Sequence, residues 1–222
     1  AVAAVYRRAL DGAGFAQPVI ASATAVTTPG WEPTGVKMLG PYDWVAPAYW
    51  SSPRAPGGAR GFATEVGPGA SVPELERLPR FLTPAERTRL WREPDARQAH
   101  AGIGPHFSDL TRFSRALAAR LGAPSGLVDY VRKAQLMQYE ANRAQFEAFS
   151  AARGEATGVV YWQATGAWPT LHWSLWGDDL ATGGGFYGAH RGFAGLSATL
   201  LGAVPALVLY ALTFFLAGSG GG

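Results

Sequence analysis

The 222 residues are enough to bury a hydrophobic core in one or two domains. Apolar residues make up 48% of the chain and aromatic residues 12%, which excludes an intrinsically disordered protein, and the lack of cysteine excludes a disulfide scaffold or a thiolate zinc site. The net charge is +3, but the arginines are scattered between Arg7 and Arg191 without a basic cluster, so we expect no nucleic-acid partner.

The first part of the chain predicts short strands separated by loops. An amphipathic helix over 2–14 ends in a glycine-rich stop. Strands are expected at 18–23, 36–40 and 61–65, and an aromatic, proline-rich loop at 41–50 follows the second of them. The chain starts at Ala1 and shows no signal peptide, so we expect it to be a piece of a longer protein.

The second part predicts helices and one further strand. Two helical stretches are expected between 71 and 91, and the second begins with a capping box from Thr83 to Glu86. Further elements are expected at 107–121 (helix), 127–152 (helix) and 158–162 (strand). Short apolar strands alternating with helices indicate βα units and a parallel sheet, but about four strands are too few to close an eight-stranded barrel.

The tail of the chain differs in composition. No charged residue follows Gly192, and residues 196–217 are nearly all apolar and long enough to cross a bilayer. Three interpretations stay open: a membrane anchor with Arg191 at its edge, a buried helix of a larger protein, or a changed reading frame near the end of the gene. We therefore divide the chain into a domain over 1–190 and a tail over 191–222.

Glu65 is the candidate catalytic residue. It ends a small apolar strand and precedes a loop rich in glycine and proline, which is where barrels of parallel strands place their catalytic groups. A carboxylate there can act as the nucleophile of a retaining glycoside hydrolase, which needs a second carboxyl group about 5–5.5 Å away. Taken alone, one glutamate after a strand is a weak signal, and a helix cap or a surface residue explains it better.

Two groups of aromatic residues follow predicted strands. Aromatic faces suit sugar rings, but large aromatic residues are also common in cores, and we expect about half of these to be core. They are Tyr42, Trp44, Tyr49 and Trp50 after one strand and Trp162, Trp168, Trp173 and Trp176 after another. Asp43, Asp178 and Asp179 are candidates for binding hydroxyl groups or an amine, or for capping loops.

No metal or cofactor site is predicted. The four histidines, at 100, 106, 172 and 190, lack the spacing of metal ligands. The glycines at 183–185 lack the strand–glycine–helix context of a phosphate loop and are interpreted as a flexible turn.

Four stretches in order along the chain carry a more specific pattern. They are 37–50 (KMLGPYDWVAPAYW), 61–73 (GFATEVGPGASVP), 130–147 (YVRKAQLMQYEANRAQFE) and 157–162 (TGVVYW), the last followed by LHW at 171–173. Together they resemble glycoside hydrolase family 2, and most closely its exo-β-D-glucosaminidase branch. The similarity runs from about residue 1 to residue 190, and then the apolar tail begins.

The resemblance implies an α/β fold, the C-terminal half of a (β/α)8 TIM barrel, with strands five to eight at 18–23, 36–40, 61–65 and 158–162. It makes Glu65 the nucleophile. The acid/base belongs at the end of strand four, before Ala1, so we expect the remainder of a parent chain to supply it and the fragment alone to be inactive. The residues expected to contact the substrate are Tyr42, Asp43, Trp44, Trp162, Trp168, His172 and Trp173.

The activity that the resemblance implies is retaining hydrolysis of terminal β-D-glucosaminides in chitosan oligosaccharides, without a cofactor. The alternatives are a β-mannosidase of the same family and a catalytically dead module that binds carbohydrate or is tethered to a membrane. Secretion is expected because polymeric chitosan lies outside the cell, with anchoring through 196–217 as an addition.

Overall fold

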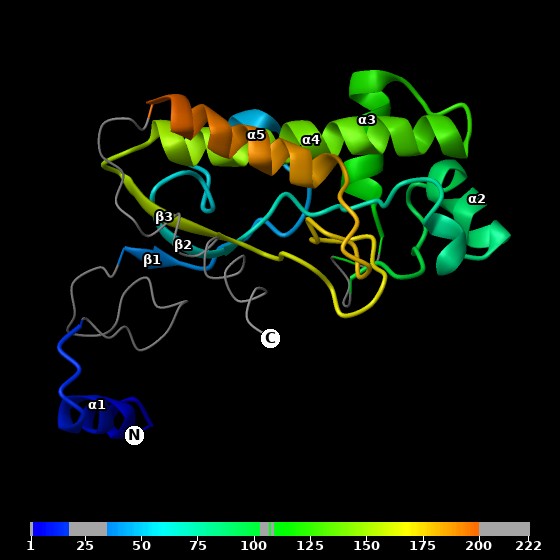
Figure 1. Ribbon diagram of the computed structural model, residues 1–222. Coiled ribbons are helices and arrows are strands. Elements are labelled where there is room, and N and C mark those ends of the chain that lie inside the picture. The colour runs from blue at the N-terminus through cyan, green and yellow to red at the C-terminus, as the bar shows by residue number, and fades with distance from the viewer. Residues whose placement is uncertain (1, 18–34, 103–106, 108, 200–222) are drawn as a thin grey trace.

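The computed structural model describes residues 2–17, 35–102, 107 and 109–199, which form a mixed α/β structure (Figure 1). The helices and strands, in chain order, are α1 (Val2–Gly12), β1 (Val36–Lys37), β2 (Gly61–Val66), α2 (Pro84–Arg92), α3 (Thr111–Leu121), α4 (Leu127–Ala151), β3 (Ala156–Tyr161) and α5 (Gly184–Thr199). Short 3-10 turns lie at Pro47–Tyr49 (η1) and Leu78–Arg80 (η2).

The described strands form one parallel sheet in the order β1-β2-β3, which confirms the predicted α/β class with parallel strands. Val36 of β1 lies opposite Phe62 of β2. β1 is shorter than the strand predicted at 36–40, because Gly40 turns the chain with a φ of 69° and Pro41 has no N–H to donate to a ladder. The strand predicted at 18–23 lies outside the described residues.

The helices α4 and α5 lie side by side over one face of the sheet (Figure 1). The sheet contributes Ala63, Val66 and Val159 to a buried cluster, and α4 contributes Phe146 and Phe149. α4 runs for 25 residues without a glycine or proline, so nothing in its sequence interrupts the helix. Its second half therefore forms the layer on which the sheet rests.

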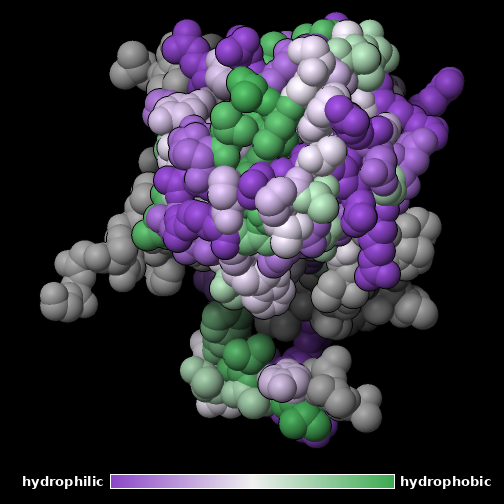
Figure 2. Space-filling model, turned by 90° about the vertical axis from the view of Figure 1, so that its right-hand side faces the viewer, coloured by the Kyte–Doolittle hydropathy of each residue, from purple (hydrophilic) through white to green (hydrophobic). Residues whose placement is uncertain are grey.

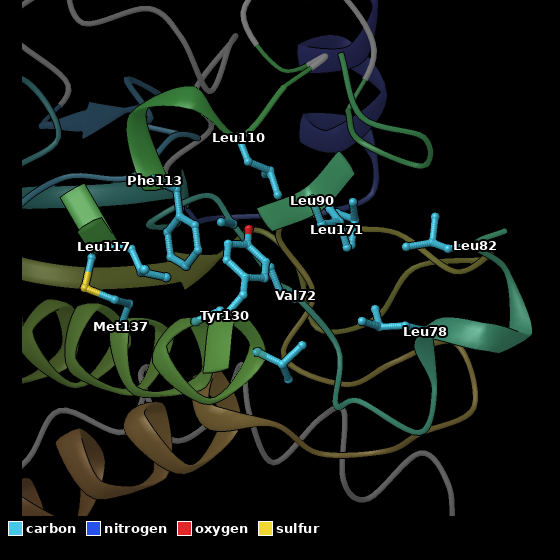
Figure 3. Close-up of a cluster of buried hydrophobic side chains, with 13 residues drawn as sticks. Val72, Leu78, Leu82, Leu90, Leu110, Phe113, Leu117, Tyr130, Met137 and Leu171 are labelled. Atoms are coloured by element: carbon cyan, nitrogen blue, oxygen red, sulfur yellow. The ribbon is translucent and has the colours of Figure 1, made fainter. Parts of the chain in front are cut away.

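A second buried cluster surrounds the first half of α4 (Figure 3). Tyr130 and Met137 of α4 pack with Phe113 and Leu117 of α3. The other large members come from the chain between β2 and α3 and from the loop after β3: Val72, Leu78, Leu82, Leu90, Leu110 and Leu171. Complete burial of such a side chain stabilises the fold by about 1.5–3 kcal/mol. The cluster thereby fixes the segments that follow β2 and β3 against α4.

The start of α5 corrects the prediction of a flexible turn at 183–185. Glycines recur on one side of this helix at 184, 188 and 192, four residues apart. A Cβ atom would lie 2.0 Å from Gln135 O if added at Gly184, 2.1 Å from Tyr139 O at Gly188 and 2.9 Å from Arg143 O at Gly192. These glycines let the backbones of α4 and α5 touch. The prediction was wrong because their small size serves helix packing here and not flexibility.

Helix starts follow the local signals with two differences. Thr83 Oγ1 accepts a hydrogen bond from the Glu86 N–H, and the Glu86 carboxylate accepts one from the Thr83 N–H, which confirms the capping box. The stretch before it is the single 3-10 turn η2 and not an α-helix. α3 begins later than predicted, at Thr111, where Asp109 Oδ1 accepts the Thr111 N–H (2.8 Å).

The two ends of the described chain are helical. α1, at the bottom of Figure 2, has apolar and polar side chains next to each other, and Val5 and Tyr6 are exposed. α5 continues through the boundary predicted between 190 and 191. Most of the apolar span predicted at 196–217 lies outside the described residues, so the anchor stays a prediction. None of the helices within the described ranges is long and apolar enough to cross a membrane.

Candidate active site

The candidate site lies at the carboxyl ends of the three strands. Glu65 is next to the last residue of β2, the middle strand. Tyr42 follows β1, and Trp162 comes directly after β3. Parallel strands end at the same edge of a sheet, and ligands of such sheets bind at that edge. The topology therefore brings together residues that are 23 positions (65 − 42) and 97 positions (162 − 65) apart in the sequence.

Tyr42 and Glu65 form a pair, in which the phenol lies close enough to the carboxylate to respond to it both as a negative charge and as a hydrogen-bond acceptor. Burial raises the pKa of Tyr42 to about 12, and the negative charge of Glu65 and the hydrogen bond to it add to this shift. The phenol is therefore protonated at neutral pH and remains a donor. A protonated phenol at this position can donate to the carboxylate without taking its charge.

Hydrogen bonds join Trp162 and Trp173 to the segments that carry this pair. The Trp162 N–H donates to the Val66 carbonyl at the end of β2 (2.8 Å), and the Trp162 side chain is 38% exposed. The Trp173 indole donates through Nε1 to the Tyr42 carbonyl (2.7 Å), a bond between residues 131 positions apart. Trp173 has a φ of 67°, a backbone conformation that non-glycine residues rarely adopt.

Phe107 completes an aromatic cluster that sequence reasoning missed. Its ring meets Trp173 edge to face at 5.3 Å between centroids and meets Tyr42 at 6.3 Å. Such pairs contribute about 0.5–1.5 kcal/mol beyond the area that they bury. The sequence had placed Phe107 in a helix, and no local signal marks a residue that reaches two rings from distant loops.

Asp43 and Trp44 follow Tyr42 in the loop after β1. Asp43 Oδ1 accepts the Trp44 N–H (2.7 Å), and Arg112 lies 3.3 Å from Asp43 Oδ2. Burial raises the pKa of Asp43, while the Trp44 N–H and Arg112 act in the opposite direction. Trp44 packs against the cluster of Figure 3, and its Nε1 is buried without a hydrogen-bond partner in the described part of the chain. Arg112 was not anticipated from the sequence.

His172 and Trp168 occupy contrasting positions in the loop after β3. Trp168 is 64% exposed. His172 is 2% exposed, and its Nδ1 accepts the Gly102 N–H (3.1 Å). Burial lowers the pKa of His172 to about 4, with Asp109 acting weakly in the opposite direction, so the ring is neutral at pH 7. In this structure His172 holds the backbone around Gly102.

The loop after β3 is tied to the segment after β2 by ion pairs. Arg77 and Arg80 both bind the Asp179 carboxylate, whose Oδ1 also accepts the Ala181 N–H (3.2 Å). Asp179 thus caps its own loop, one of the two roles considered for it. A pocket beside these residues is lined by, among others, Glu74, Thr170, Asp178 and Thr182. Among the described residues, no group of three or more His, Asp or Glu side chains is placed to hold a metal ion.

Comparisons with known proteins find relatives over most of the chain. The chain is 46% identical over 190 residues to an exo-β-D-glucosaminidase of Streptomyces avermitilis, which covers 84% of this chain and 21% of the relative. It is 42% identical over 197 residues to an exo-β-D-glucosaminidase of Hypocrea jecorina, which covers 85% and 22%. No protein-family model matches the chain.

A solved structure shows the same relationship in three dimensions. The exo-chitosanase CsxA of Amycolatopsis orientalis superposes with a TM-score of 0.78 at 38% identity, over 84% of this chain and 23% of that chain. The solved structures of that protein include complexes with PNP-β-D-glucosamine. The present chain spans about a fifth of the length of the curated relatives that it matches. Over that span, in sequence and in fold, the chain is similar to exo-β-D-glucosaminidases.

Proposed function

We propose that this chain is the part of a retaining exo-β-D-glucosaminidase that carries the nucleophile, Glu65. One observation supports this most directly: Glu65 stands at the carboxyl edge of the parallel sheet, with the Tyr42 phenol close enough for the carboxylate to contribute to its raised pKa. The substrate class follows from the relatives, which are exo-β-D-glucosaminidases at 46% and 42% identity. The substrate would be the terminal glucosamine unit of a chitosan oligosaccharide.

The reaction proceeds in two steps. Glu65 attacks the anomeric carbon and forms a glycosyl-enzyme ester, while a carboxylic acid from the rest of the parent chain protonates the leaving oxygen. The same carboxyl group, now ionised, then takes a proton from water, which attacks the anomeric carbon and releases Glu65. Tyr42 holds one oxygen of Glu65 so that the other faces the sugar.

The remaining candidate residues would shape the sugar pocket. Trp162 bonds Val66, the residue after Glu65, and Trp173 bonds the Tyr42 carbonyl, so their aromatic faces would pack on the sugar ring. Exposed Trp168 is a candidate for the next sugar unit. Asp43 and Trp44 would shape the loop beside Tyr42 through the pair with Arg112. For His172 we propose support of the 100–102 backbone rather than direct contact.

We also propose that the sheet is the end of a (β/α)8 barrel that the parent chain completes. β1, β2 and β3 would be strands six to eight, and 18–23 would be strand five. Along β3, Val159 is 8% exposed and packs under the helices, whereas Val160 is 37% exposed. This alternation leaves one face of the sheet free for the other strands. Secretion follows from the polymeric substrate, and an anchor at 196–217 remains an additional prediction.

The test is hydrolysis of chitosan oligosaccharide by the parent protein beside its Glu65→Gln variant. Glu65→Gln is expected to reduce kcat by at least about 10³-fold, because the amide cannot form the glycosyl ester. Glu93→Gln changes the same functional group on a side chain that is 60% exposed in an ion pair, and it should leave kcat unchanged. Equal activity of Glu65→Gln and the parent would refute the assignment.

Aryl substrates separate the alternatives. Faster turnover of aryl β-glucosaminide than of aryl β-mannoside supports the proposal, and the reverse order supports the β-mannosidase. A folded parent protein that hydrolyses neither would leave the carbohydrate-binding module as the better explanation.

A further inference from the structure

Lys37 is a buried charge that the proposed mechanism does not use. It lies in β1 opposite Ala63 and is 6% exposed. Its Nζ donates to the carbonyls of Gly58 and Pro56 (3.3 Å for Pro56) and lies 5.9 Å from the centroid of the Phe149 ring. A buried ammonium group is costly unless it is hydrogen-bonded. The two carbonyls accept hydrogen bonds from the ammonium group, and these bonds fix the 56–58 loop to the sheet.

Gly57 lies between Pro56 and Gly58 and supports the turn with which the candidate site begins. A Cβ atom at Gly57 would lie 2.3 Å from the Gly40 carbonyl oxygen, so the two backbones are in direct contact. The Gly57 N–H also donates to the Tyr49 hydroxyl (2.9 Å). Gly40 has a φ of 69° and begins the turn to Tyr42, whose ring packs against it: a Cβ atom at Gly40 would lie 2.8 Å from Tyr42 Cδ2.

Lys37 also supports the Tyr42–Glu65 pair through its backbone. Its carbonyl accepts a hydrogen bond from Thr64 Oγ1 (3.2 Å), and Thr64 directly precedes Glu65. Burial, and to a lesser degree the positive charge of Arg60, lowers the pKa of Lys37 to about 8, so it still carries its charge at neutral pH. The side chain thus supports Tyr42 through the 56–58 loop, and the backbone supports Glu65 through Thr64.

We propose that Lys37 is a positioning residue that holds Tyr42 against Glu65 by way of Gly57 and Gly40. This rests on the proposed function, because it takes Glu65 as the nucleophile. Lys37 touches no reacting atom in this arrangement. Its ammonium group holds the 56–58 loop, and the loop holds the turn that aims the phenol.

Two variants of the parent protein break the support at different points. Lys37→Met removes the donors while keeping an unbranched side chain. Gly57→Ala keeps the ammonium and pushes a methyl group against Gly40. Lys133→Met is the control, because Lys133 also donates to two backbone carbonyls, at Gly122 (3.1 Å) and Ala123 (3.2 Å) between α3 and α4. Lys133 also pairs with Asp129. Lys37→Arg retains a charged donor and should restore part of the loss.

Kinetics on aryl β-glucosaminide give the first readout. Lys37→Met and Gly57→Ala are expected to lower kcat by about tenfold or more with a smaller change in KM, because small misplacement of a catalytic pair costs this much. In a Tyr42→Phe background, Lys37→Met should lower kcat little further, since its effect runs through the phenol. Losses that multiply in the double variant would overturn the proposal, as would a kcat equal to that of Lys133→Met.

Hydrogen–deuterium exchange gives a readout that needs no substrate. Peptides over 38–44 and 55–60 should exchange faster in Lys37→Met than in the parent or in Lys133→Met. Unchanged exchange in both peptides would overturn the support role whatever the activity. If the parent hydrolyses no glycoside, the proposed function fails while exchange still decides the role of Lys37.

Discussion

Tyr42 is the side chain on which the chemistry of the site depends most after Glu65. Its pKa of about 12 means that it stays protonated throughout the physiological range. Its backbone has a φ of 55°, and its ring packs against Gly40. Its carbonyl accepts a hydrogen bond from the Trp173 indole. Tyr42 is therefore fixed by several contacts, and a hydrogen bond from its phenol to Glu65 costs little extra ordering.

The first prediction concerns this hydrogen bond. Tyr42→Phe in the parent protein should reduce kcat by about 10- to 100-fold, because hydrogen bonds to charged groups contribute about 1.5–3 kcal/mol. Steady-state hydrolysis of aryl β-glucosaminide measures the effect. Tyr187→Phe is the control, since Tyr187 is exposed and bonds Thr182 (3.2 Å). A kcat for Tyr42→Phe equal to that of the control would contradict the assigned role.

The second prediction concerns His172 and pH. Its pKa in the fold, about 4, lies below the ordinary value of 6.5, so the unfolded chain binds the proton first as the pH falls. The contribution of His172 to the free energy of unfolding is therefore fully present above about pH 6.5. It decreases as the pH falls toward 4, by as much as about 3 kcal/mol. Urea unfolding at pH 7.5 and 4.5 measures it.

His172→Asn provides the comparison, because the amide oxygen can still accept the Gly102 N–H but does not titrate. The difference in unfolding free energy between the two pH values should be smaller in this variant. The same difference in both proteins would show that other groups control the acid sensitivity.

At the scale of elements, the contact between α4 and α5 determines how the end of the described chain is packed. α5 approaches α4 with glycines at 184, 188 and 192, each opposite a backbone carbonyl of α4. Beside them, Phe193 of α5 packs on Phe146 of α4 at 4.2 Å between ring centroids. Close packing of this kind tolerates no added volume at the glycines.

The third prediction tests that contact. Gly188→Ala should destabilise the fold by about 1–3 kcal/mol, because a methyl group 2.1 Å from the Tyr139 carbonyl forces the helices apart. In Gly12→Ala the new methyl group meets no atom within 4 Å, so that change in α1 should be neutral or slightly stabilising. Thermal unfolding of both variants gives the answer, and a Tm for Gly188→Ala at or above the parent value would refute close packing.

At the scale of the whole molecule, the described sheet is covered on one side, while Val160 of β3 and Trp162 directly after β3 are exposed. A retaining mechanism requires a second carboxyl group about 5–5.5 Å from the nucleophile. The resemblance assigns that group to a strand before Ala1. The chain and the rest of its parent would thus share one active site.

The fourth prediction follows from that division. The 222-residue chain produced alone should release no glucosamine from chitosan oligosaccharide, whereas the parent protein should release it. Co-expression of the upstream segment as a separate chain should recover part of the activity, because burying the free face of the sheet favours association. Turnover by the isolated chain would mean that a carboxyl group within 1–222 acts as the acid/base.

The sequence by itself determined the features that depend on near neighbours. The capping box at Thr83 and the length of α4 follow from residues a few positions apart, and the parallel strands follow from the alternation of short apolar segments with helices. The resemblance supplied the expected role of Glu65, which a lone glutamate after a strand does not reveal.

Only the tertiary structure decided which distant groups meet. In the fold, the glycines of α5 contact the backbone of α4, and Lys37 is buried against the 56–58 loop. The Phe107 ring contacts the rings of both Tyr42 and Trp173. These outcomes depend on volumes and hydrogen bonds between segments up to 131 positions apart. Local sequence patterns record the preferences of each segment, whereas packing selects the partners, because a close contact forms only where both surfaces fit.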